Sequence, residues 1–157
     1  MLVPLFCSCH LFLANAMYAC YLKNWVVFEL MFVSYVFSAL HYLTYTEESM
    51  YHYLDMYASR SAVGFLIPYS TKYVHYAYSA MALNNIVLSY GMSRCVYWLD
   101  PENLTWIWFH IYFHMSTSFC VFVFLKNYQS WVECGMSLRC KNEIETVKKT
   151  LSYNKRE

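Results

Sequence analysis

Two histidines lie four residues apart in the apolar stretch Trp106-Ile-Trp-Phe-His110-Ile-Tyr-Phe-His114-Met-Ser-Thr-Ser118. Residues at this spacing share one face of a helix, so the two imidazoles point the same way. Imidazoles are costly in hydrocarbon unless they pair, bind a ligand or line a wet cavity. The stretch therefore predicts a transmembrane helix that carries half of a metal site.

The composition is that of a membrane protein. Of 157 residues, 59% are hydrophobic, 21% are aromatic and 13% are charged, whereas soluble domains carry about 25% charged residues. The length allows one domain, and a net charge of +1 argues against nucleic acid as a partner. Most of the Lys and Arg residues lie from Lys126 onward. We therefore predict a transmembrane domain over residues 1–126 and a cytoplasmic tail over residues 127–157.

Apolar segments separated by polar breaks predict an all-α fold, a polytopic transmembrane helix bundle of about five spans. Each segment suits a hydrocarbon core of about 30 Å. The predicted spans are residues 2–22, 25–44, 51–69, 73–92 and 104–125. Residues 93–103 predict a polar-aromatic loop, and residues 143–151 predict an amphipathic helix in the tail. A cleavable signal peptide is the alternative for the first span, because Ala14-Asn-Ala16 resembles a cleavage site, although no basic residues precede the span.

The charges in the loops orient these spans. With the C-terminus in the cytoplasm, Lys23, Lys72 and Lys126 fall on the cytoplasmic side and Arg94 falls outside. Cytoplasmic loops carry the excess of Lys and Arg, so we predict an outer N-terminus and a cytoplasmic C-terminus. Either the plasma membrane or an endomembrane fits this orientation.

The same orientation places four polar side chains at one level of the membrane. His41 lies near the end of the second span, Asp55 near the start of the third, and His110 and His114 in the first half of the fifth. All four fall within roughly 5–15 Å of the outer boundary, at a rise of about 1.5 Å per residue. His52, three residues before Asp55, is a candidate to support a metal ligand.

Three neutral imidazoles and one open position are what a catalytic zinc ion needs, and we predict His41, His110 and His114 as its ligands. Zinc lowers the pKa of a bound water to about 7, and Asp55 is the candidate to take the proton of that water. Ser38 lies on the helical face of His41, as does Ser34, and a serine there suits hydrogen bonding to a substrate oxyanion. The alternative for each histidine is a structural hydrogen bond to a neighbouring Ser or Tyr, and for the serines simple helix packing.

A b-type haem is another group that transmembrane histidines hold. Its two axial ligands approach from opposite sides of the ring, so His110 and His114 on one helix cannot hold one haem between them. His41 with either of them can, and an absorption spectrum with a Soret band would distinguish haem from zinc.

Three motifs in this order resemble the signature of the CREST superfamily of seven-helix membrane hydrolases: Ser38-Ala-Leu-His41, Asp55-Met-Tyr-Ala-Ser59 and His110-x-x-x-His114. The superfamily takes in alkaline ceramidases, progestin and adipoQ receptors and GPI-remodelling lipases. The layout of residues 13–41 is most similar to the myomaker-like branch, and the resemblance covers about residues 10–125.

The resemblance implies a zinc-dependent integral-membrane hydrolase that cleaves an amide or acyl ester bond of a lipid near the outer leaflet. His41, His110 and His114 would bind the zinc, and Asp55 would serve the water. This chain differs in two respects: Ser38 lies three residues before His41, where the family has four, and five helices replace seven. Some members of the branch remodel or fuse membranes, so a non-catalytic remodelling, fusion or receptor protein is the alternative. Both functions imply membrane lipids as partners.

Overall fold

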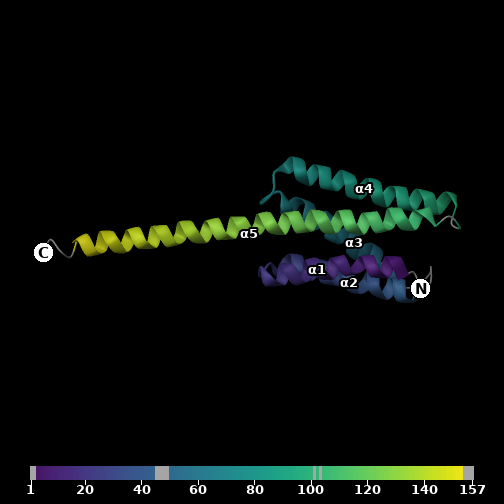
Figure 1. Ribbon diagram of the computed structural model, residues 1–157, viewed down its shortest axis with the longest axis horizontal. Coiled ribbons are helices and arrows are strands. Elements are labelled where there is room, and N and C mark those ends of the chain that lie inside the picture. Colours follow the sequence, from purple (N-terminus) through teal and green to yellow (C-terminus); the bar gives the residue numbers. More distant parts are fainter. Residues whose placement is uncertain (1–2, 45–49, 101, 103, 154–157) are drawn as a thin grey trace.

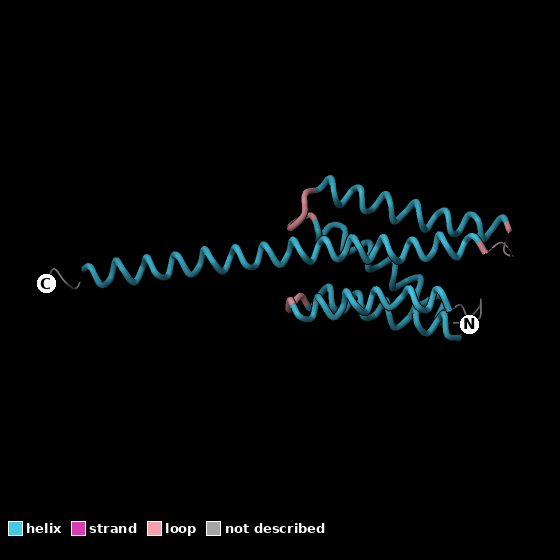
Figure 2. The backbone as a smooth tube through the Cα atoms, viewed as in Figure 1, coloured by secondary structure: helices cyan, strands magenta, loops and turns pink. Residues whose placement is uncertain are grey.

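The computed structural model describes residues 3–44, 50–100, 102 and 104–153, with side chains up to residue 136. Within these residues the chain forms five helices and no strand, which confirms the all-α prediction (Figure 1). Short connections join the helices where the chain is described (Figure 2). The helices are α1 (Val3–Tyr21), α2 (Trp25–Thr44), α3 (Met50–Ser70), α4 (Tyr76–Leu99) and α5 (Thr105–Tyr153).

Three helical segments in the described residues are long and apolar enough to cross a membrane: α1, α2 and Thr105–Met136 of α5. α3 and α4 have 21 and 24 residues, so length does not exclude them. Asp55 and Arg60 make α3 less apolar, as the many Ser, Asn and Tyr side chains do for α4. The chain is therefore a helical protein with three candidate spans, and the five-span bundle stays a prediction.

The turn between α1 and α2 follows from three residues, Leu22-Lys23-Asn24. Lys23 adopts a left-handed backbone conformation, with a φ of 57°. The N–H groups of Lys23 and Asn24 donate to the carbonyls of Cys20 and Ala19, each at 2.9 Å, which closes the end of α1 as a Schellman motif. The Asn24 side-chain oxygen then accepts from the Val27 N–H at 3.3 Å and caps α2. The two helices consequently form an antiparallel hairpin.

α5 lies between α4 on one side and the α1–α2 hairpin on the other (Figure 1). α3 packs against α2 and α4. The Asn15 side-chain amide of α1 donates to the Ser118 carbonyl of α5 at 3.0 Å, and both residues are buried. The first and last helices are therefore neighbours. The largest fully buried side chains are Leu5, Met31, Leu125 and His114.

Two boundaries differ from those expected. Residues 93–99, predicted as loop, form the last turns of α4. α5 continues past the predicted domain boundary at Lys126 and contains the predicted tail helix 143–151, because no proline follows Pro101 to interrupt it. The extra turns of α4 carry Ser93 and Arg94, which line a cavity beside α5.

Candidate functional site

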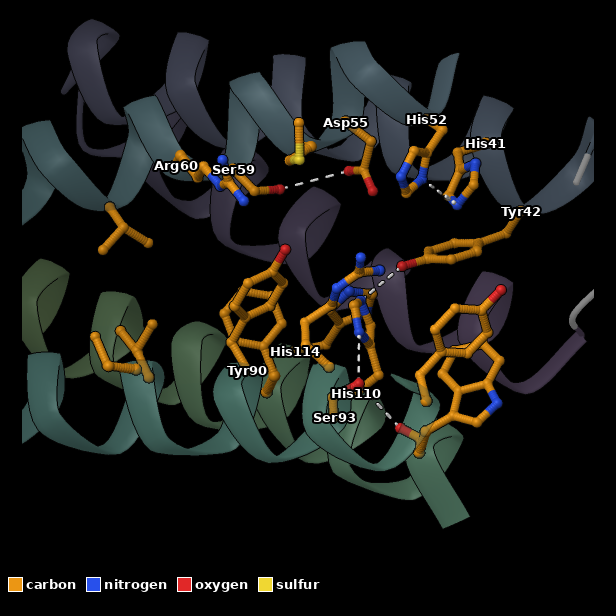
Figure 3. Close-up of a pocket in the computed structure, with 18 of the residues that line it drawn as sticks. His41, Tyr42, His52, Asp55, Ser59, Arg60, Tyr90, Ser93, His110 and His114 are labelled. Atoms are coloured by element: carbon orange, nitrogen blue, oxygen red, sulfur yellow. Dashed lines mark hydrogen bonds between the residues drawn. The ribbon is translucent and has the colours of Figure 1, made fainter. Parts of the chain in front are cut away.

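A cavity of about 500 Å³ lies between α2, α3, α4 and α5. Figure 3 shows His41, His52 and Asp55 on one side of it and His110 and His114 on the other. Four of the five predicted site residues line the cavity, namely His41, Asp55, His110 and His114. The fifth, Ser38, is outside the lining and touches the Asp55 carboxylate.

His110 is held at both ring nitrogens. Its Nε2 lies 2.8 Å from the Tyr42 hydroxyl of α2, and its Nδ1 lies 3.2 Å from the Ser93 hydroxyl of α4. Ser93 Oγ also donates to the Trp106 carbonyl at 3.1 Å. A hydroxyl has one hydrogen, so Ser93 must accept from His110, which assigns the proton of the neutral ring to Nδ1. The Nε2 lone pair then accepts from Tyr42.

His114, on the same face of α5, is also held by a serine at its Nδ1. It is 1% exposed, and its Nδ1 lies 2.8 Å from the Ser8 hydroxyl of α1. Ser8 Oγ donates to the Leu5 carbonyl at 2.9 Å, so Ser8 too is left to accept from the ring. The network thus assigns the His114 proton to Nδ1, with the lone pair on Nε2.

The two serines therefore present both imidazoles of α5 in one tautomer. A histidine that binds a metal commonly donates its second ring N–H to a neighbouring oxygen, which fixes the ring and its tautomer. The ring centroids of His110 and His114 are 5.0 Å apart. At Nδ1 the pair on one helical face therefore has the hydrogen-bonding pattern of metal ligands, and a metal at Nε2 of His110 would have to displace the Tyr42 hydroxyl.

His41 faces a different neighbour. Its Nε2 lies 3.4 Å from Nδ1 of His52 on α3, with the ring centroids 4.9 Å apart. The predicted supporting residue thus contacts the predicted ligand. His41 is 6% exposed and is paired across the α2–α3 interface, rather than with the histidines of α5.

Asp55 is oriented by hydroxyls. Ser38 of α2 donates to Oδ1, and Ser59, one turn further along α3, donates to the same oxygen at 3.4 Å. Among the described residues, none donates a hydrogen bond to Oδ2 of Asp55. The Asp55 side chain lines the cavity. A carboxylate held at one oxygen and turned to a cavity with the other is placed to accept a proton.

The residues fit zinc in ligand type and in tautomer. As the described side chains are placed, however, no group of three or more His, Cys, Asp or Glu residues is arranged to hold a metal ion. His41 pairs with His52, while His110 and His114 pair on α5. Zinc binding therefore stays a prediction. It would require His41 to move closer to His110 and His114.

Other polar residues of the sequence lie elsewhere. Ser34 is buried outside the cavity lining, and its hydroxyl has no hydrogen-bond partner among the described residues. His10 on α1 contacts Tyr35 at 3.5 Å, and His75 caps α4 by accepting from the Ala77 N–H at 3.3 Å. Neither histidine lines the cavity.

Three hydroxyl residues of the site escaped the sequence analysis, namely Ser8, Tyr42 and Ser93. Tyr42 follows His41 directly, so adjacency was the one signal available for it. Ser8 and Ser93 lie far along the chain from the histidines they hold, and Ser93 was expected in a loop.

A second cavity of about 570 Å³ adjoins the first. Val63 of α3 and Ile86 of α4 line both, so the two spaces meet between these helices. The second cavity is lined largely by apolar side chains of α3, α4 and α5. The cavity with the titratable residues is the more polar of the two, and it opens onto a more apolar one.

No family model, curated protein or solved structure matches the chain.

Proposed function

We propose that the chain is a zinc-dependent integral-membrane hydrolase that cleaves an amide or acyl ester bond of a lipid near the outer leaflet. The observation that carries the proposal is the common tautomer of His110 and His114, set by two serines from two other helices. An oriented carboxylate, Asp55, lines the same cavity. The adjoining apolar cavity suits the chain of a lipid.

Each residue has a role in this proposal. His41, His110 and His114 would hold the zinc, which when bound supplies the Lewis acidity for hydrolysis. Asp55 would accept the proton of the attacking water at the oxygen that faces the cavity. Ser38 holds Asp55 in place, so the structure favours a positioning role over hydrogen bonding to the substrate.

The wild-type protein provides the direct test. Purified in maltoside micelles and loaded with zinc, it should release fatty acid from at least one lipid in a panel of N-acyl sphingoid bases and acyl-ester phospholipids. His10→Ala is a matched control, because His10 lies outside the cavity and should leave the rate unchanged.

A non-catalytic remodelling, fusion or receptor protein is the second candidate. The pairing of His41 with His52, away from His110 and His114, favours it, since three ligands are not gathered in the structure. Zinc-loaded protein that hydrolyses no lipid of the panel would establish this candidate in place of the hydrolase.

The serines that hold the histidines should tune zinc affinity. Ser8→Ala and Ser93→Ala should each weaken zinc binding by about 10–100-fold, because each removes the oxygen that fixes a ligand tautomer. Competition with a chromogenic chelator measures the change. Ser130→Ala is the control, since its exposed hydroxyl bonds only the Lys126 carbonyl of its own helix. Equal affinity in all three variants would contradict a supporting role for Ser8 and Ser93.

The proposed hydrolase crosses the membrane five times, with its N-terminus outside. Cys95, near the end of α4, would then lie toward the outside, and Cys134 of α5 toward the cytoplasm; both are exposed. In intact cells a membrane-impermeant maleimide should label a variant that keeps only Cys95 and leave one that keeps only Cys134 unlabelled. If only Cys134 is labelled, the topology is the reverse of the one proposed. If both cysteines are labelled equally, they lie on the same side, and the five-span topology is wrong.

A further inference from the structure

One charge in the first cavity has no part in the proposed hydrolysis. Arg60 is the middle residue of α3, with ten residues of helix on either side. At about 1.5 Å per residue, it is roughly 15 Å from each end of the helix, further than its side chain extends. It lines the cavity beside Ser59 (Figure 3). If α3 crosses the membrane, as the proposed five-span topology has it, a charge at this depth is costly and marks a functional site.

A second arginine reaches the same cavity from the opposite helix. Arg94 of α4 lines it, and its guanidinium lies 5.6 Å from the ring centroid of Tyr97. The ring orients the guanidinium without neutralising it. Two arginines from two helices therefore border one partly open cavity, and both side chains are exposed.

The charges of the lining residues do not balance. Asp55 is the single carboxylate among them. It accepts hydrogen bonds from the hydroxyls of Ser38 and Ser59. With the histidines neutral, the two arginines leave the cavity with an excess of positive charge. Such an excess favours an anionic ligand, and a guanidinium matches the oxygens of phosphate in a two-pronged hydrogen bond.

We propose that Arg60 and Arg94 bind the phosphate of a single-chain lipid, whose chain lies in the adjoining apolar cavity. Val63 lines both cavities and lies three residues after Arg60, one turn along the same face of α3. The cation therefore lies next to the passage between the polar and apolar spaces. This inference rests on the proposed lipid hydrolase for its biological meaning and narrows the substrate to phosphate-bearing lipids.

Binding without turnover tests it. Protein in maltoside micelles, with a metal chelator present, is titrated with lysophosphatidate, with monoacylglycerol of the same chain and with inorganic phosphate. Lysophosphatidate should bind at least about tenfold more tightly than monoacylglycerol, since a hydrogen bond to a charged group contributes about that factor. Equal affinities of the two lipids overturn the proposal. If inorganic phosphate binds as tightly as lysophosphatidate, the site is one for the free anion, and the proposal of a lipid ligand is overturned.

Variants locate the effect. Arg60→Gln and Arg94→Gln should each abolish the preference for lysophosphatidate, while Lys72→Gln, outside the cavity, should keep it. Arg60→Lys retains the charge and should keep part of the preference, which guards against a glutamine variant that fails to fold. A preference that survives both glutamine variants overturns the assignment to the arginines. The chelator removes any metal, so binding is measured without turnover. A negative binding result therefore does not contradict the proposed hydrolase, and absence of hydrolysis does not contradict the proposed phosphate-lipid binding.

Discussion

Replacing Asp55 with asparagine should lower the rate of lipid hydrolysis by about 10²–10⁴-fold, the usual contribution of a general base. Asparagine keeps the size of the side chain and an oxygen that accepts from Ser38, but it cannot take a proton from water. Fatty acid release from zinc-loaded protein measures the loss, and zinc content measured in parallel should stay unchanged.

Asp100→Asn is the matched control. Asp100 is exposed at the end of α4 and lies outside the cavity lining, so its substitution should leave the rate at the wild-type level. A rate in Asp55→Asn within a few-fold of the wild type would remove Asp55 from the chemistry, and an equal fall in both variants would point to a general effect of charge.

His114→Ala should reduce zinc from stoichiometric binding to less than about a tenth of that occupancy, because a site with three protein ligands rarely survives on two. His110→Ala and His41→Ala should do the same. Elemental analysis of the purified protein measures the metal directly. His114 is buried and bonded to Ser8, so His114→Gln serves as a second variant of similar volume.

His75→Ala is the control for these variants, since His75 caps α4 at a distance from the cavity. It should keep its zinc. If His41→Ala keeps its zinc while His110→Ala and His114→Ala lose it, the metal is held by His110 and His114 with a ligand other than His41. Absence of zinc from the wild-type protein would remove the metal from the proposal.

The sequence predicted five helical segments because polar residues separate the apolar stretches. Lys23-Asn24 separates α1 from α2, and Asn24 caps the second of these helices. It misplaced the end of α4, since residues 93–99, with Arg94 and Trp98 among them, resemble a loop in composition but continue the helix up to Leu99. Helix propensity cannot distinguish a polar helix end from a loop here, because packing against α5 determines whether residues 93–99 are helical.

His41, Asp55, His110 and His114 all line one cavity, and their positions along the predicted helices were the signal that placed them at one level. The partners of these residues were not predictable, because depth gives no information on the rotation of a helix about its axis. Ser38 illustrates the difference: its helical face was known, yet its contact with Asp55 depends on how α2 and α3 face each other. The same holds for the turn of His41 toward His52.

The contact between Ser8 and His114 spans 106 residues, and that between Asn15 and Ser118 spans 103. A chain is synthesised from its N-terminus, and contacts between distant segments form after the intervening chain is complete. Until α5 has been synthesised, the Ser8 hydroxyl of α1 therefore has the Leu5 carbonyl of its own helix as its partner, and the contact with His114 is still missing. The cavity is consequently among the last parts of the molecule to assemble, and a chain that ends before His110 leaves its first helix without the neighbour that orders the site.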